Sequence, residues 1–206
     1  MSSKRFEAPA VKCDSANVMD SEAHILRENT ETSGLVRAAR AAVAVLTDHD
    51  IPHLVIGGLA VQEHGYPRLT LDVDLVVPDV LEAVEWLTAD LSGTFKRVAK
   101  VEDRVTHSAT GVAIDLLPAG RVVKRGCLVP FPLPGKVTNQ LQIVPLADLI
   151  SLKLDSAANA PLRRLRDKTD VVELITRRNL SRDLAVAEPV RQAYLELWDG
   201  LKAEPN

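Results

Sequence analysis

In the ten-residue segment 68–77, polar and apolar residues alternate from Arg68 to Leu75. Its polar members are Arg68, Thr70, Asp72 and Asp74, and its apolar members are Leu69, Leu71, Val73, Leu75 and Val77. Because successive side chains of a β-strand point to opposite faces, the alternation predicts a strand over 68–77 with one apolar and one polar face. Pro78 ends this strand. The chain is therefore expected to build its core around a sheet.

Weaker patterns on either side of this strand predict an α+β fold. Helical spacing begins after Thr32 or Ser33 and runs to about His49. Asp79 is placed to cap a further helix that ends near Leu91. The other expected elements are strands at 53–56, 94–100, 103–108, 111–117 and 141–144, and helices at 59–64, 146–157, 161–178 and 182–201. Strands with interspersed helices, followed by helices alone, predict a mixed-sheet core and a helical tail.

The order of these predicted elements divides the chain into three parts. Residues 1–31 are polar and irregular, which is typical of a flexible leader. Residues 32–144 hold the predicted strands, and residues 145–206 hold only predicted helices. We therefore expect a leader, a catalytic core and a C-terminal helical subdomain.

Composition narrows the class of protein. Aromatic residues make up 3% of the 206 residues and hydrophobic residues 46%, so aliphatic side chains must fill the core. The net charge of −3 argues against a general electrostatic attraction to nucleic acid, although a local basic patch is compatible with it. No apolar run approaches the roughly 20 residues of a membrane span. Cys13 and Cys127 lack metal-ligand spacing, so we expect free thiols and a cytoplasmic protein without membrane association.

The pair Asp72 and Asp74 is the first candidate for chemistry. Period-two geometry places both carboxylates on one side of the strand, about 7 Å apart along the chain. Asp is disfavoured in strands, and two unpaired carboxylates repel each other. A divalent cation removes that repulsion, and Mg²⁺ typically uses one or two carboxylates together with substrate phosphates. The alternative is a solvated polar face, which the Asp-x-Asp pattern alone favours.

Two further signals change that balance. Gly57 and Gly58 lie where a strand is expected to pass into a helix, and bare backbone N–H groups there can hold phosphate oxygens, although such a pair is often only a turn. Asp115 lies in the apolar strand GVAIDLL and needs a partner or a metal, because an unpaired buried carboxylate is costly. These three signals, in this order, indicate a phosphate-handling metal site.

At this point the chain resembles a known family. The run VIGGLAVQEHGYPRLTLDVDLVV and the later GVAIDLL are similar to the core of minimal nucleotidyltransferases of the DNA polymerase β-like superfamily. The segment VPLADLISLKLDSAANAPLRRLRDKTDVVELI is similar to the helical part of the same proteins, including abortive-infection toxin relatives. The resemblance covers roughly residues 35–178. Many members carry Ser directly after the first Gly, whereas Gly58 stands here, as in antibiotic-modifying and toxin-like branches.

The resemblance implies specific roles for these residues. Gly57 and Gly58 would hold the β- and γ-phosphates of a nucleoside triphosphate such as ATP. Asp72 and Asp74 would bind two Mg²⁺ ions, with Mn²⁺ as an alternative. Asp115 would share the second metal and accept the proton of the attacking hydroxyl.

Arg68, Thr70 and Lys153 are secondary candidates for binding the nucleotide. Arg68 could touch a phosphate or pair with Asp72, and Thr70 lies on the same strand face. Lys153 lies on an apolar helix, where it either extends to solvent or reaches a triphosphate as the resemblance suggests.

Three further features favour structural roles. Arg163, Arg164, Arg166 and Lys168 form a basic turn that Asp167 and Asp170 could neutralise on the same helix. His64 and His107 show no oriented partner of the kind that nucleophilic catalysis requires.

The leading hypothesis is therefore a nucleotidyltransferase that transfers a nucleoside monophosphate to a hydroxyl of a small molecule, a tRNA or a protein. The alternative is a non-catalytic nucleotidyltransferase-like binding protein or a component of a toxin–antitoxin pair, with a cognate antitoxin as its partner. A structural domain with an incidental Asp-x-Asp is a third possibility.

Overall fold

The computed structural model describes residues 33–89, 91–162 and 164–203. The predicted leader at 1–31 lies outside the described residues, as do Cys13 and Arg163. In the part of the chain that is described, no helix has the length and apolar character needed to cross a membrane.

A five-stranded mixed sheet forms the centre of the N-terminal half. Its strands are β1 (Leu54–Ile56), β2 (Asp72–Val77), β3 (Phe95–Arg97), β4 (Arg104–His107) and β5 (Ala113–Pro118), and their order is β1-β2-β5-β4-β3. β2 and β5 run parallel, and the other neighbours pair antiparallel. The central pair β2 and β5 therefore has a partner on both sides, which fits their apolar sequences.

Helices surround the sheet and make up the C-terminal part. They are α2 (Gly34–Asp48), α3 (Gly57–Glu63), α4 (Val80–Ala89), α5 (Leu146–Asn159), α6 (Leu165–Arg178) and α7 (Arg191–Ala203), with a short 3-10 helix at Glu188–Val190. The two predicted caps are present: Ser33 Oγ accepts a bond from Val36 N–H at 3.4 Å, and Asp79 Oδ1 accepts one from Leu81 N–H at 2.9 Å. The predicted α+β fold with a mixed sheet and a helical C-terminal segment is confirmed.

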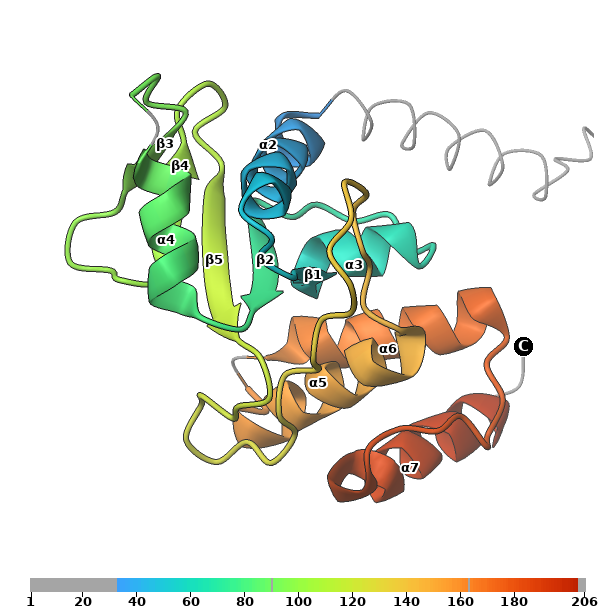
Figure 1. Cartoon of the computed structure of the whole chain (residues 1–206). Helices are drawn as coiled ribbons and strands as arrows, with labels where there is room; N and C mark the ends of the chain where they lie inside the picture. Colours follow the sequence, from blue (N-terminus) through green and yellow to red (C-terminus); the bar gives the residue numbers. More distant parts are fainter. Residues whose placement is uncertain (1–32, 90, 163, 204–206) are drawn as a thin grey trace, which may run out of the picture.

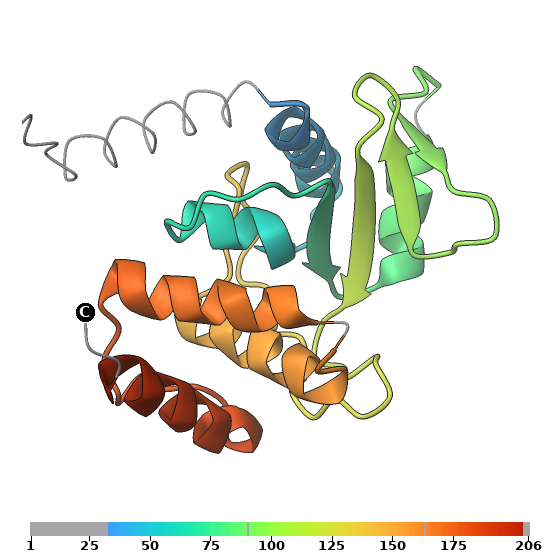
Figure 2. The ribbon, with the colours of Figure 1, turned by 180° about the vertical axis from the view of Figure 1, so that it is seen from behind.

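The two faces of the sheet pack against different helices. Val73, Leu75 and Val77 of β2 join a buried apolar cluster with residues of α2 and α4. Val76, on the other face of β2, joins a second cluster with residues of α5, α6 and α7. Figures 1 and 2 show these C-terminal helices gathered against one side of the sheet. Period two therefore sends the polar half of β2 toward α5 and α6.

The structure corrects the limits of two predicted elements. β2 begins at Asp72 rather than Arg68, and the side chains of Leu69 and Leu71 are each 76% exposed. Ladder pairing with β5 starts at Asp72, so residues 68–71 alternate without a partner strand. The helix predicted from 182 begins at Arg191, because Pro189 cannot donate the backbone bond of a helix interior.

The predicted strand at 141–144 is reduced to a single parallel bridge between Ile143 and Val55. Whether 145–206 forms a separate subdomain stays a prediction, since its helices share a core with β1 and β2.

Candidate active site

Three carboxylates lie on one face of the sheet. Asp74 on β2 is paired in register with Asp115 on the parallel strand β5, and Asp72 lies two residues before Asp74. All three side chains are half-buried and line one cavity. The alternation of β2 and the parallel pairing with β5 thus bring together carboxylates that are about forty positions apart in the chain.

Gly57 and Gly58 make room for the carboxylate group. Gly57 has a φ of +66°, and a Cβ built on it would collide with the Asp74 carboxylate. A Cβ on Gly58 would collide with the Thr70 hydroxyl. This hydroxyl donates to Asp72 Oδ1 at 3.2 Å, so Thr70 orients one of the paired aspartates. Gly57 is therefore required by the close approach of β2, whereas Thr70, which precedes β2, fills the space that a side chain at position 58 would take.

Asp74 carries the strongest electrostatic signal in the site. Burial, together with the charges of Asp72 and Asp115, raises the pKa of its carboxyl from 3.8 to about 6. The positive charges of Lys153 and Lys124 offset part of this increase. A carboxylate that is partly removed from solvent and repelled by two others favours the binding of a cation.

The opposite wall of the cavity is a network of ion pairs. Arg68 makes a bidentate pair with Asp170 on α6, with Nε–Oδ1 at 2.6 Å and Nη2–Oδ2 at 2.9 Å. Lys153 on α5 lies 2.7 Å from Asp167 Oδ1 and 2.8 Å from Asp170 Oδ2. Burial alone would raise the pKa of Asp167, but the charge of Lys153 and hydrogen bonds from Lys153 and Ser156 lower it below its ordinary value.

This network corrects two sequence-based interpretations. Arg68 pairs with Asp170 from a distant helix and not with Asp72, because the chain turns away from the ladder before β2 begins. Lys153 is buried and does not extend to solvent. Asp170 pairs with Arg68 and Lys153 and not with the basic residues of its own helix. Asp167, in contrast, lies 3.9 Å from Arg164.

Arg104 is a site residue that sequence reasoning missed. It lies directly across from Asp115 on the antiparallel strand β4. Its Nη2 donates to Asp115 Oδ2 at 2.8 Å, and its Nε donates to Asp115 Oδ1. The hydrogen bond from Arg104 to Asp115 raises the pKa of the guanidinium, which keeps it charged. The sequence does contain a signal for this pair. If the chain forms a hairpin with its turn after His107, the two strands that flank the turn place Arg104 opposite Asp115.

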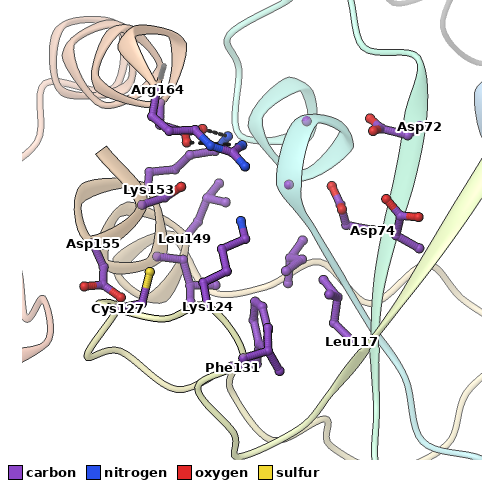
Figure 3. A pocket seen from close by; sticks show the side chains of 18 of the residues that line it. Asp72, Asp74, Leu117, Lys124, Cys127, Phe131, Leu149, Lys153, Asp155 and Arg164 are labelled. Carbon is purple, nitrogen blue, oxygen red and sulfur yellow. Dashed lines mark hydrogen bonds and ion pairs between the residues drawn. The ribbon is translucent and has the colours of Figure 1, made fainter. Parts of the chain in front are cut away.

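The cavity has a volume of about 490 Å³ and unites every predicted site residue. Its lining includes Gly57, Gly58, Arg68, Thr70, Asp72, Asp74, Asp115 and Lys153. In Figure 3, Asp72 and Asp74 lie on one side, Lys153 and Arg164 on the other, and Lys124 points between them. The long connection before α5 supplies Lys124, Val129 and Phe131.

The remaining candidates separate by position. Arg164 and Arg166 line the cavity, whereas Lys168 is exposed and outside it. His64 Nε2 is bonded to the Val144 carbonyl at 2.7 Å, and His107 is buried with its Nδ1 2.8 Å from the Thr110 hydroxyl. Both histidines therefore have structural contacts away from the carboxylates, as their sequence context had suggested.

The donor set suits a divalent cation that is completed by substrate. Within the described ranges, no three His, Cys, Asp or Glu side chains are arranged as a ready metal site. Asp72 and Asp74 offer hard oxygen ligands beside the bare backbone of Gly57, while both oxygens of Asp115 are engaged by Arg104. This fits the mode in which Mg²⁺ uses one or two carboxylates plus phosphates.

Comparison with known proteins supports the fold. No family model matches the sequence, and no curated protein matches it. A solution structure of the antibiotic-resistance factor ANT(2'')-Ia, an aminoglycoside nucleotidyltransferase, is similar with a TM-score of 0.50 and 14% identity, over 81% of this chain and 94% of that one. The chain has a nucleotidyltransferase-like fold.

Two further solved structures show weaker similarity. A crystal structure of ANT(2")-Ia in complex with adenylyl-2"-tobramycin gives a TM-score of 0.46 and 13% identity, over 82% of this chain and 98% of that chain. JHP933 from Helicobacter pylori gives 0.38 and 14%, over 81% and 88%.

Proposed function

We propose that this protein is a Mg²⁺-dependent nucleotidyltransferase that transfers a nucleoside monophosphate from a nucleoside triphosphate to an acceptor hydroxyl. One observation carries the proposal: three carboxylates on one sheet face lie across a single cavity from a basic wall on α5 and α6. Separated negative and positive walls are suited to a triphosphate whose metal ions face the carboxylates.

The basic wall would hold the triphosphate through several cations. Lys153 uses its ammonium group on Asp167 and Asp170, which leaves one of its three donors for a phosphate oxygen. Lys124 and Arg166 have no ion-pair partner among the described residues and line the same cavity. Arg68 is held by Asp170 and would then position Lys153 through their shared carboxylate, with Gly57 and Gly58 offering backbone N–H groups to the phosphates.

The carboxylates would hold the metal ions and manage the proton. Mg²⁺ bound by Asp72 and Asp74 supplies charge neutralisation for the phosphates. The acceptor oxygen forms a bond to the α-phosphorus, the bond from that phosphorus to the bridging oxygen breaks, and pyrophosphate leaves with the electron pair. Asp115 would accept the proton of the acceptor hydroxyl once Arg104 no longer occupies both of its oxygens.

The acceptor would enter along the connection that precedes α5. Leu117, Val129, Phe131 and Leu149 give this side of the cavity an apolar surface. Its buried carboxylate, Asp155, accepts bonds from Leu128 N–H and Val129 N–H at 3.0 Å and is not free for a cationic acceptor. These features select no single class of acceptor, so the test includes a small molecule, a tRNA end and a protein side chain.

The test is a transfer assay with each labelled nucleoside triphosphate, Mg²⁺ and a panel of the three acceptor classes. The parent should bind at least one triphosphate and transfer its monophosphate. The Asp72→Ala/Asp74→Ala variant should do neither, and Asp199→Asn, on the exposed surface of α7, is the matched control. Tight nucleotide binding without transfer to any acceptor would support a non-catalytic binding protein instead.

Asp115→Asn separates binding from chemistry. Removing a general base costs about a hundredfold to ten-thousandfold in rate, so turnover should fall by that factor while nucleotide binding is retained. Unchanged turnover would remove Asp115 from the proposed mechanism.

A further inference from the structure

Asp115 is the one carboxylate of the group whose two oxygens are both bound by a cation. Arg104 Nε and Nη2 donate to Oδ1 and Oδ2 in a parallel, bidentate arrangement. Such fork-to-carboxylate pairs are the strongest geometry available to Arg. In this state Asp115 has no oxygen that is free of the guanidinium, whereas Asp72 has only the hydroxyl of Thr70 and Asp74 has no hydrogen-bond partner among the described residues.

Arg104 can nevertheless leave this pair. Its side chain is 41% exposed, against 20% for Asp115, and it lines the same cavity as Asp72 and Asp74. A phosphate in that cavity offers the guanidinium a second bidentate acceptor with more negative charge than a carboxylate. Two acceptors thus compete for one guanidinium.

We propose that Arg104 is a positioning residue that couples nucleotide binding to the release of Asp115. Without nucleotide, Arg104 acts as the counterion of Asp115 and keeps it from a metal ion or a proton. When a triphosphate enters, the guanidinium moves to a phosphate and Asp115 becomes available at the same step. This inference rests on the proposed function and adds a residue to it.

The coupling has a consequence for metal binding alone. A cation that approaches Asp115 in the absence of nucleotide must displace Arg104 and is also repelled by it. Because coupling free energies act in both directions, nucleotide should strengthen metal binding by the same factor by which metal strengthens nucleotide binding. Removing Arg104 should therefore tighten metal binding without nucleotide and reduce that factor.

The experiment measures bound Mn²⁺ by electron paramagnetic resonance, with and without a triphosphate analogue that has a methylene bridge between its α- and β-phosphates. Without the analogue, Arg104→Gln should bind Mn²⁺ about tenfold more tightly than the parent. Its affinity for the analogue should fall about tenfold or more, because a charge-assisted contact is lost. Arg104→Lys, which keeps the charge and loses the fork, should lie between these values.

A double-mutant cycle separates this pair from general charge effects. In an Asp115→Asn background, Arg104→Gln should change Mn²⁺ affinity by less than about twofold. Arg97→Gln removes the same charge from the exposed edge strand β3, away from the cavity, and should leave both affinities unchanged. Equal gains in both backgrounds would mean that Arg104 acts only by long-range charge, and this would overturn the inference.

The outcomes also distinguish this inference from the proposed function. If the parent binds neither Mn²⁺ nor any triphosphate, the proposed function fails and the role of Arg104 fails with it. If the parent binds both and Arg104→Gln binds Mn²⁺ as the parent does, only the role of Arg104 is contradicted.

Discussion

The cavity has two charged walls that are built in opposite ways. On the sheet, Asp115 is paired with Arg104, and Asp72 and Asp74 have no ion-pair partner among the described residues. On the helices, Asp167 and Asp170 are matched by Arg68, Lys153 and Arg164. The pKa of Asp74 is accordingly raised to about 6, whereas that of Asp167 lies below its ordinary value.

This difference separates a site for external cations from an internal support. A carboxylate whose charged form is disfavoured gains free energy when a metal ion binds, so the sheet wall is suited to ligand binding. A carboxylate whose charged form is already stabilised gains little from a further cation, so the helical wall fixes the shape of the cavity and the position of Lys153.

The largest expected effect is on transfer when Asp74 is changed. Under the proposed function, Asp74→Asn removes a metal ligand and should lower the rate on the order of a thousandfold. The measurement is single-turnover transfer at saturating triphosphate. A loss below tenfold would mean that the sheet wall does not carry the chemistry.

A substitution in the helical wall should lower the stability of the protein. Asp170→Asn leaves Arg68 and Lys153 without their shared buried carboxylate, so the free energy of unfolding should fall by about 3 kcal/mol. Urea denaturation measures it. Arg182→Gln breaks the exposed pair with Asp199 and serves as the control, with little change expected. Equal losses in the two variants would contradict the support role.

Gly57→Ala tests the contact between backbone and carboxylate. Its Cβ would collide with Asp74 and displace it, so triphosphate affinity should fall about tenfold or more. Gly93→Ala is a matched control, because Gly93 has a φ of +67° and nothing within 4 Å of the added Cβ. Both variants carry the strain of a left-handed residue at about 1 kcal/mol. Nucleotide affinity should therefore fall only in Gly57→Ala, as measured by calorimetry.

The smallest effect is a gain in stability of the metal-free protein. The folded pKa of Asp74 is about 6 against an ordinary 3.8, so the folded state binds more protons between these values and loses stability as pH rises through that window. Asp74→Asn should then raise the free energy of unfolding by about 1–2 kcal/mol at pH 8. The gain should shrink as pH falls below 6 and vanish near pH 4.

Asp167→Asn gives the opposite sign in the same measurement. Its folded pKa is depressed, so its carboxylate stabilises the protein above the unfolded pKa, and this contribution is lost as pH falls through the folded pKa. The variant should be less stable than the parent at pH 8 and approach it in acid. Shifts of the same sign for both variants would erase the distinction between the two walls.

Local pattern was sufficient for much of the fold and for the sheet wall. The period-two alternation of Asp72 to Leu75 and the caps at Ser33 and Asp79 depend on neighbours within a few residues, so they were predictable. The strand predicted to begin at Arg68 and the last helix predicted to begin at residue 182 were both too long. A hydrophobic pattern predicts which face a side chain would occupy. A strand also needs a partner strand, which residues 68–71 lack, and a helix needs backbone N–H donors, which Pro189 lacks.

The helical wall was not predictable in the same way. Lys153 and Asp170 were visible as single charges, and nothing local indicated that Arg68 would cross to Asp170 about a hundred positions later. Lys124 lies in a connection without periodicity, and its position follows from the bonds that anchor the neighbouring backbone to Asp155.

The sequence by itself determined the three carboxylates and the glycines beside them, because alternation along β2 and the needs of a buried Asp115 are local constraints. Only the tertiary structure decided how each carboxylate is partnered. The register between β4 and β5 places Arg104 opposite Asp115. The packing of α6 against the segment before β2 brings Asp170 within ion-pair distance of Arg68. Pairing of charges depends on distances across the fold, and those distances are set by strand register and helix packing rather than by spacing along the chain.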